Sequence, residues 1–180
     1  MKSVAVLCAK PNSVYLSKPQ CEVYDIKRNA LTFDHALPVV AHPPCRLFGR
    51  LAWKAKPREG EYELALFCAE AVKRCGGVLE HPAHSKLWSA ASLPAPGDFT
   101  GHGFTLPVMQ QDFAHRAPKP TWLYIVGVSP RSLPRWQMRL GFAEGRIELM
   151  GKPEREATPE PFADFLLAIA RRAAVAEVAA

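Results

Sequence analysis

A strand–helix–strand pattern in the first half of the chain constrains the fold most. Residues 38–41 form a short apolar run, and residues 78–80 form another. Between them, apolar side chains repeat at helical spacing, and the pair Gly76-Gly77 predicts the end of that helix. The repeat consists of Leu64, Phe67, Cys68, Ala71, Val72 and Cys75. A helical crossover between two strands predicts parallel pairing, and therefore an open α/β sheet.

Other apolar segments predict further strands of this sheet. They cover residues 4–8, 21–26, 104–109 and 121–128, with a short last strand at residues 146–150. Thr158 is predicted as the N-cap of a final helix and Pro159 as its first-turn residue. The predicted fold class is α/β, Rossmann-like, with a mostly parallel sheet flanked by helices. A single domain over residues 1–180 accounts for the length.

Composition and charge narrow the function classes. The chain has 48% hydrophobic and 22% charged residues, which excludes global disorder. Its net charge of +6 favours nucleic acid or another polyanion as a partner. The cysteine number is odd and no C-x-x-C pair occurs, which favours reduced thiols and a cytoplasmic location. No apolar run reaches the ~18 residues of a membrane-spanning helix, so no membrane partner is expected.

Two residues with catalytic chemistry follow the two strands of the central unit. Pro43-Pro44-Cys45 comes directly after the strand at residues 38–41, and Glu80 ends the next strand. Open α/β sheets bind ligands beyond the carboxyl ends of their strands, and two prolines stiffen a loop. Cys45 is therefore a candidate nucleophile and Glu80 a candidate acid beside it. A cysteine that is only structural remains the alternative.

These elements, in this order, resemble carbon-5 cytosine methyltransferases, and in particular small phage or prophage proteins related to those enzymes. Pro43-Pro44-Cys45 is similar to their cysteine loop and Glu80 to their strand-end acid. Residues 110–122 resemble their polar Gln/Arg motif, and residues 157–161 resemble the start of their late helix. The resemblance implies a methyltransferase-like fold and a transferase that modifies DNA with S-adenosylmethionine as cofactor. If the gene is phage-encoded, the expected location is the host cytoplasm.

The resemblance also implies roles for individual residues. Cys45 would add as a thiolate to carbon 6 of the pyrimidine, and the Glu80 carboxyl group would hold the ring nitrogen. Arg46 and Arg50 are candidates to lower the pKa of the thiol, because a free thiol titrates near about 8.5. The predicted substrate is DNA, including single-stranded DNA, or a pyrimidine nucleotide. The residues expected to contact the substrate are Arg46, Arg50, Gln110, Arg116 and Lys119.

Two departures from the family pattern leave an alternative open. The family's first strand leads into a glycine-rich turn for the cofactor, whereas residues 8–13 contain no glycine. Asp25 and Pro43 are the remaining candidates for cofactor contact. No separate target-recognition domain fits between Lys119 and Thr158. The alternative is a catalytically inactive module that binds nucleic acid, a nucleotide or a protein partner.

Two further sets of residues bear on binding. The segment 46–58 is basic and contains Phe48 and Trp53, which predicts a loop that binds single-stranded DNA through charge and stacking. The histidines match no metal-ligand spacing, so no metal site is predicted. Those weighed as ligands are His42, His81, His84, His102 and His115.

Overall fold

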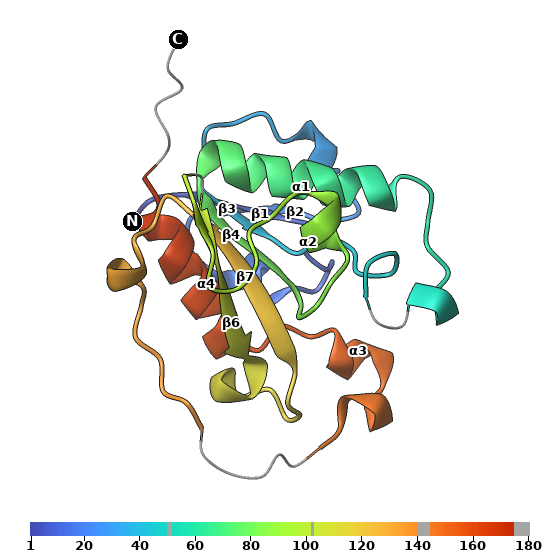
Figure 1. The fold of residues 1–180 in the computed structure, drawn as a ribbon. Coiled ribbons are helices and arrows are strands. Elements are labelled where there is room, and N and C mark those ends of the chain that lie inside the picture. The colour runs from blue at the N-terminus through green and yellow to red at the C-terminus, as the bar shows by residue number, and fades with distance from the viewer. Residues whose placement is uncertain (50–51, 102, 140–144, 175–180) are drawn as a thin grey trace.

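The computed structural model describes residues 1–49, 52–101, 103–139 and 145–174. These residues form a seven-stranded sheet in the order β2-β1-β3-β4-β7-β6-β5 (Figure 1). The strands are β1 Val4–Leu7, β2 Cys21–Tyr24, β3 Val39–Ala41, β4 Gly77–Pro82, β5 Phe99–Thr100, β6 Gly103–Met109 and β7 Pro120–Val126.

The α/β class is confirmed, and the expectation of a mostly parallel sheet is correct only in part. Strands β2, β1, β3 and β4 pair in parallel, whereas β7 is antiparallel to both β4 and β6. The reason is the short connection at residues 110–119, which reverses the chain between β6 and β7. Parallel strands need a longer crossover, such as the helix between β3 and β4. β6 consequently runs in the same direction as β4.

The helices match the central prediction and correct two others. They are α1 Glu61–Cys75, α2 Leu87–Ala90, α3 Lys152–Arg155 and α4 Glu160–Arg172. The strand predicted at residues 146–150 is wrong, because Ile147–Leu149 forms the 3₁₀ turn η6, closed by a bond from the Leu149 amide to the Arg146 carbonyl. Thr158 is not the N-cap of α4; Pro159 occupies that position without a side-chain cap. No helix in the described part of the chain is long and apolar enough to cross a membrane.

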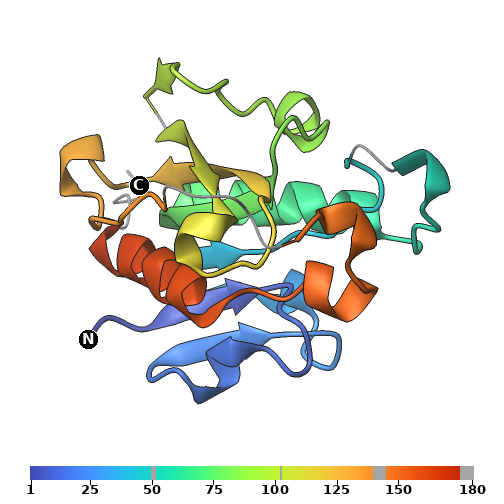
Figure 2. The same cartoon turned by 90° about the horizontal axis from the view of Figure 1, so that it is seen from below.

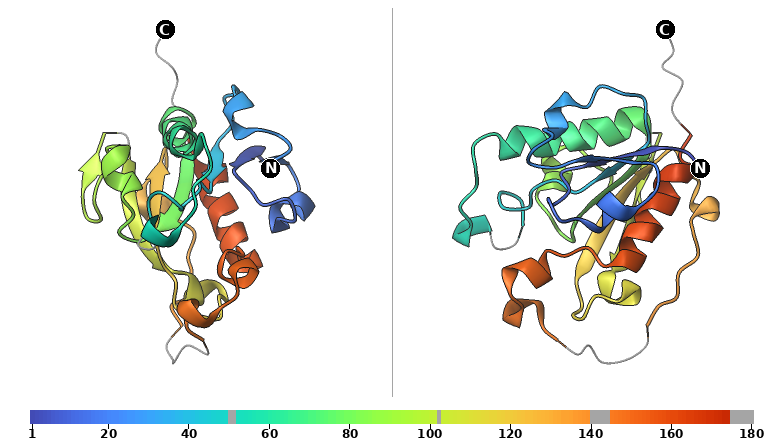
Figure 3. Two further views of the ribbon diagram at one scale, coloured as in Figure 1. Left: turned by 90° about the vertical axis from the view of Figure 1, so that its right-hand side faces the viewer. Right: turned by 180° about the vertical axis from the view of Figure 1, so that it is seen from behind.

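Helices α1 and α4 cover opposite faces of the sheet (Figures 2 and 3). Successive residues of a strand point to opposite faces, so each central strand contributes to two cores. In β4, Leu79 is fully buried in the core with α1, and Val78 is fully buried in the core with α4. The strands between the helices are therefore buried on both faces, which explains their continuous apolar runs.

The turn from α1 into β4 sets where the two strands end. Gly77 has φ +120°, and a Cβ atom there would collide with the carbonyl oxygen of Val39 in β3. Only glycine combines this conformation with such a close approach. The resulting register pairs Ala41 of β3 with Leu79 of β4. The next residue after β3, His42, thus lies beside Glu80, which continues in β4 and pairs with Leu123 of β7.

The chain order of the strands marks one edge as the place for a ligand. β1 has β2 on one side and β3 on the other, so the sheet changes winding direction between β1 and β3. Ligands of open α/β sheets bind beyond the carboxyl ends of the strands at such a point. The carboxyl ends of β1, β3, β4 and β6 share this edge, which we call the carboxyl edge.

Candidate active site

Cys45 and Glu80 are carried by the adjacent parallel strands β3 and β4, Cys45 in the loop after β3 and Glu80 in β4 itself. Cys45 is exposed in the loop after β3, whereas only 12% of the Glu80 side chain is exposed at the end of β4. The two strands are parallel neighbours, and the charge of Glu80 contributes to the raised pKa of Cys45. The thiol and the carboxylate therefore belong to one site.

Glu80 is the centre of a chain of polar side chains that includes residues far apart in sequence. His42 Nδ1 lies 3.0 Å from Glu80 Oε2, and the Tyr15 hydroxyl lies 2.9 Å from His42 Nε2. On the other side, Gln110 Nε2 donates to Glu80 Oε1 at 3.0 Å and to Thr121 Oγ1 at 2.9 Å. We call these five residues, Tyr15, His42, Glu80, Gln110 and Thr121, the polar chain. It holds the Glu80 carboxylate in one orientation.

The charge state of the polar chain follows from its contacts. Burial by itself raises the pKa of Glu80, but the hydrogen bond from His42 and the charge of Lys119 outweigh it and lower the pKa to about 2. Glu80 is therefore ionised at neutral pH and only accepts hydrogen bonds, so His42 Nδ1 is the donor. Burial, and then the Glu80 charge, raise the pKa of Tyr15 well above its usual range, so its hydroxyl keeps its proton.

The surroundings of Cys45 favour the thiol over the thiolate. Partial burial raises its pKa, and the carboxylates of Glu80 and Glu156 add to this, while Lys119 opposes them. Arg46, expected to lower this pKa, instead forms a two-point ion pair with Glu61 of α1, with Nε 2.9 Å from Oε2. Arg50 lies outside the described residues. Cys45 is consequently protonated at neutral pH in the free protein.

The loop that carries Cys45 is tied to the loop after β4. The Cys45 carbonyl accepts the amides of Phe48 at 3.2 Å and Gly49 at 2.8 Å. The Phe48 carbonyl in turn accepts the Lys86 amide at 3.0 Å and the Ser85 hydroxyl at 3.4 Å. These bonds, together with Pro43 and Pro44, keep the thiol at a constant position relative to Glu80.

The polar segment between β6 and β7 contributes three predicted residues in different ways. Gln110 is buried and bonded to Glu80, so this segment orients the carboxylate. The charge of Lys119 lowers the pKa of both Cys45 and Glu80, so it acts on both groups. Arg116 is exposed and forms an ion pair with Glu154 of α3 at 3.0 Å. Contact of Arg116 and Lys119 with phosphate stays a prediction.

The residues after β1 and β2 do not fit S-adenosylmethionine. The chain after β1 passes through Cys8, at φ +62°, into the short 3₁₀ turn η1 (Val14–Ser17), so no glycine-lined cradle of amides is present. The Asp25 carboxylate caps its own turn by accepting the amides of Lys27 at 2.8 Å and Arg28 at 3.0 Å. Pro43 is buried. The candidate cofactor residues are thus engaged within the protein.

Sequence reasoning missed Tyr15 and His42 as site residues. His42 carried a usable signal, since it follows β3 directly and precedes the Pro-Pro-Cys loop. Tyr15 carried none, because it lies in η1 and reaches His42 only through folding. His102 lies outside the described residues, which contain no group of three or more His, Cys, Asp or Glu side chains suited to a metal.

The basic segment 46–58 divides into a buried and an exposed part. Phe48 is buried, with 3% exposed, and stacks on Tyr62 at 5.5 Å, so its predicted role in base stacking is wrong. Trp53 in η3 (Ala52–Lys54) is 76% exposed, with Lys54 Nζ 4.5 Å from its ring centre. Only Trp53 is available to stack on a base here.

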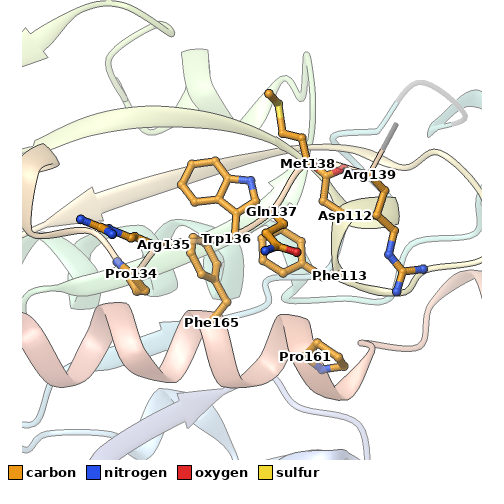
Figure 4. A pocket seen from close by; sticks show the side chains of 10 residues that line it. All are labelled: Asp112, Phe113, Pro134, Arg135, Trp136, Gln137, Met138, Arg139, Pro161 and Phe165. Atoms are coloured by element: carbon orange, nitrogen blue, oxygen red, sulfur yellow. The ribbon is translucent and has the colours of Figure 1, made fainter. Parts of the chain in front are cut away.

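Two pockets meet at Asp112, in the segment between β6 and β7, and Cys45 lines neither. A pocket of about 460 Å³ lies between α4 and residues 134–139 (Figure 4), and we call it the Trp136 pocket. A second pocket, of about 350 Å³, lies against the ends of β6 and β7, and we call it the Trp122 pocket. Thr121 of the polar chain lines the Trp122 pocket.

Comparison of the chain with known protein-family models, curated proteins and solved structures gives no match in any of the three. The functional interpretation therefore depends on the residues and on their geometry.

Proposed function

We propose that this protein is a methyltransferase-like α/β enzyme that acts at carbon 5 of a pyrimidine, in DNA or in a nucleotide, through Cys45. The observation that carries the proposal is a Glu80 carboxylate that His42 and Gln110 hold from both sides, on the strand next to the one that leads to Cys45. Carbon 5 of cytosine is a poor nucleophile. Addition of a thiol to carbon 6 converts the ring into an enamine, whose carbon 5 then reacts with electrophiles.

Glu80 would orient the base. Each carboxylate oxygen has two lone pairs, and each Glu80 oxygen already accepts one protein hydrogen bond. One further acceptor position on each oxygen remains for a donor of the base. The amino group on carbon 4 of cytosine and the imide N–H at position 3 of uracil are donors of this kind, and position 3 lies across the ring from carbon 6. A base held by the edge that includes position 3 presents carbon 6 to a nucleophile on the opposite side.

The addition step needs no bound cofactor. The sulfur of Cys45 bonds to carbon 6, the double bond between carbons 5 and 6 becomes single, and carbon 5 takes up a proton that balances the one lost from the thiol. Lys119 stabilises the thiolate during this step, since its charge lowers the pKa of Cys45. In the reverse step either hydrogen of carbon 5 can leave, so the original hydrogen exchanges with solvent.

Exchange of the carbon-5 hydrogen therefore tests the proposal directly. Deoxycytidine monophosphate and a cytosine-containing oligonucleotide are incubated with the protein in D₂O, and deuterium uptake is followed by mass spectrometry. We expect uptake with the wild type and none with Cys45→Ser. Cys21→Ser is the matched control, because this half-buried thiol begins β2 at the opposite edge of the sheet. Absence of exchange across the pH range, while the pyrimidine still binds, would falsify the proposal.

One observation favours the inactive binding module as a second candidate. The raised pKa of Cys45 leaves little thiolate at neutral pH, as expected for a site that no longer catalyses addition. This candidate requires pyrimidine binding without exchange, even when alkaline pH deprotonates the thiol. Calorimetry with S-adenosylmethionine gives a separate criterion. Saturable binding would add methyl transfer to the proposed activity, and we expect none from the residues after β1.

A further inference from the structure

The Trp122 and Trp136 pockets are adjacent halves of one surface. Asp112, Trp136 and Met138 line both of them, so the two pockets meet at the segment 134–139. Asp112 Oδ1 accepts the Arg139 amide at 3.0 Å, which fastens this segment to η4 (Gln110–Phe113). Because η4 follows β6, the surface lies along the carboxyl edge, beside the polar chain.

Aromatic side chains form the walls of both pockets. Trp136 packs on Phe113, with ring centres 6.5 Å apart and planes at 26°, and on Phe165 at 5.3 Å. It is only half-buried, so these contacts support it from one side (Figure 4). In the Trp122 pocket, the exposed His84 ring lies 4.8 Å from Trp122. Each pocket thus offers an apolar, aromatic wall of the kind on which nucleobases stack.

The Trp136 pocket is also cationic. Arg135 and Arg139 line it, both are exposed, and neither forms an ion pair with another residue that the structure describes. Figure 4 shows their guanidinium groups extending to opposite sides of the Trp136 ring. Alternating aromatic and cationic groups match a strand of flat bases joined by phosphates, and single-stranded nucleic acids are bound in this way.

The surface is connected to the site that would hold the target base. Thr121 lines the Trp122 pocket and accepts a hydrogen bond from Gln110, which also bonds to Glu80. A strand with one base at Glu80 would therefore place its neighbouring nucleotides over the two pockets.

We infer that the Trp122 and Trp136 pockets bind the nucleotides next to the target base of a single-stranded nucleic acid. Trp136 and Trp122 stack on bases, and Arg135 and Arg139 contact phosphates. The identity of the target base rests on the proposed function, whereas binding of the strand at these pockets does not.

Fluorescence anisotropy with a labelled single-stranded oligodeoxynucleotide containing one cytosine tests this inference. For single strands, each phosphate contact contributes about 0.7 to the steepness of log K against the logarithm of salt concentration. The slope of the Arg135→Gln/Arg139→Gln protein should therefore be about 1.4 less steep than that of the wild type. Arg172→Gln is the matched control. This exposed arginine lies in the last turn of α4, near Ala174, which bonds to Gly127 at the opposite edge of the sheet. Its salt dependence should equal that of the wild type.

Trp136→Leu should weaken binding about fivefold or more, which is the loss of one stacked base. An oligonucleotide with abasic sites beside the cytosine separates stacking from misfolding. Wild type and Trp136→Leu should bind that oligonucleotide equally if Trp136 stacks on a flanking base. A penalty of the same size with and without the flanking bases would overturn the stacking assignment.

The remaining outcomes distinguish the two proposals. Unchanged salt dependence in the Arg135→Gln/Arg139→Gln protein, or Trp136-dependent binding of polyglutamate as tight as that of the oligonucleotide, overturns this inference in favour of an acidic protein partner. Exchange on free deoxycytidine monophosphate without oligonucleotide binding overturns this inference alone. Oligonucleotide binding with the expected dependences but no carbon-5 exchange supports this inference and overturns the proposed function.

Discussion

The neighbouring strands β3 and β4 carry two groups that differ in how ready they are to react. The carboxylate on β4 is already ionised and oriented, whereas the thiol after β3 is still protonated. Glu80, in β4, is largely buried, bonded on both oxygens and ionised. Cys45 lies exposed in the loop after β3, and partial burial of its thiol, together with the carboxylates of Glu80 and Glu156, raises its pKa and keeps it protonated. The Glu80 carboxylate is therefore already oriented to accept a hydrogen bond from a ligand, whereas the Cys45 thiol must lose its proton before it can act as a nucleophile.

Burial makes the largest contribution to the raised pKa of Cys45, and the negative charge of Glu80 links the two groups. The same carboxylate that would bind the base also raises the pKa of the neighbouring thiol. Orientation of the base and activation of the thiol are thus opposed in the free protein. Changes to the charges around Glu80 should shift the two properties in opposite directions.

Glu80→Gln should have the largest effect, and it should change the rate of carbon-5 exchange and the rate of Cys45 alkylation in opposite directions. We expect carbon-5 exchange to fall about 10²-fold or more, the usual loss when an oriented polar group of an active site is removed. Alkylation of Cys45 by iodoacetamide near pH 8 should become faster, because removal of the charge lowers the thiol pKa. Mass spectrometry measures both rates, on the pyrimidine for exchange and on the peptides of the protein for alkylation. A parallel fall in both rates would mean that the substitution only damages the local fold.

The ionised state of Glu80 should make the free energy of unfolding depend on pH in the acid range. Its pKa is lowered from its usual value near 4.5 to about 2, so the stabilisation is complete above about pH 5 and is lost as the pH falls toward 2. The shift corresponds to about 3 kcal/mol of unfolding free energy. Urea unfolding between pH 6 and pH 2 measures it, and Glu80→Gln should flatten this part of the profile. An unchanged pH slope in the variant would show that other groups cause the acid sensitivity.

Tyr15→Phe should lower the free energy of unfolding by an intermediate amount. It leaves His42 Nε2, on a side chain that is 13% exposed, without its 2.9 Å partner, which costs about 1–3 kcal/mol of unfolding free energy. Tyr62→Phe is the matched control, because Tyr62 is 44% exposed, and its stability should change little. Thermal and urea unfolding provide the comparison. Equal losses in the two variants would argue against a stabilising Tyr15–His42 bond.

The smallest effects should come from the outer charges around Cys45. Glu156→Gln should lower the pKa of the thiol and Lys119→Gln should raise it, as the opposite signs of their charges require. The pH dependence of iodoacetamide alkylation measures both shifts. Added salt should reduce the difference, because it screens partly exposed charges. Shifts in the same direction would show that the substitutions act through loop structure rather than through charge.

Sequence patterns alone determined the central unit and the position of its two chemical groups. The helical repeat from Leu64 to Cys75, placed between two short apolar runs, predicts the β3-α1-β4 crossover. Parallel pairing then places Cys45 and Glu80 at one edge without further information. These conclusions hold because periodicity and crossover geometry are local properties of the chain.

The tertiary structure decided the partners and the charges. Three pairs of interacting side chains depend on irregular loops, whose sequences have no periodic pattern. The pairs are Tyr15 with His42, Arg46 with Glu61, and Gln110 with Glu80. The same packing buries Phe48, exposes Trp53 and turns β7 antiparallel, although the composition of these segments gives no warning. The pKa values depend on these contacts, since desolvation and charge act over a few ångströms in space, whatever the separation along the chain.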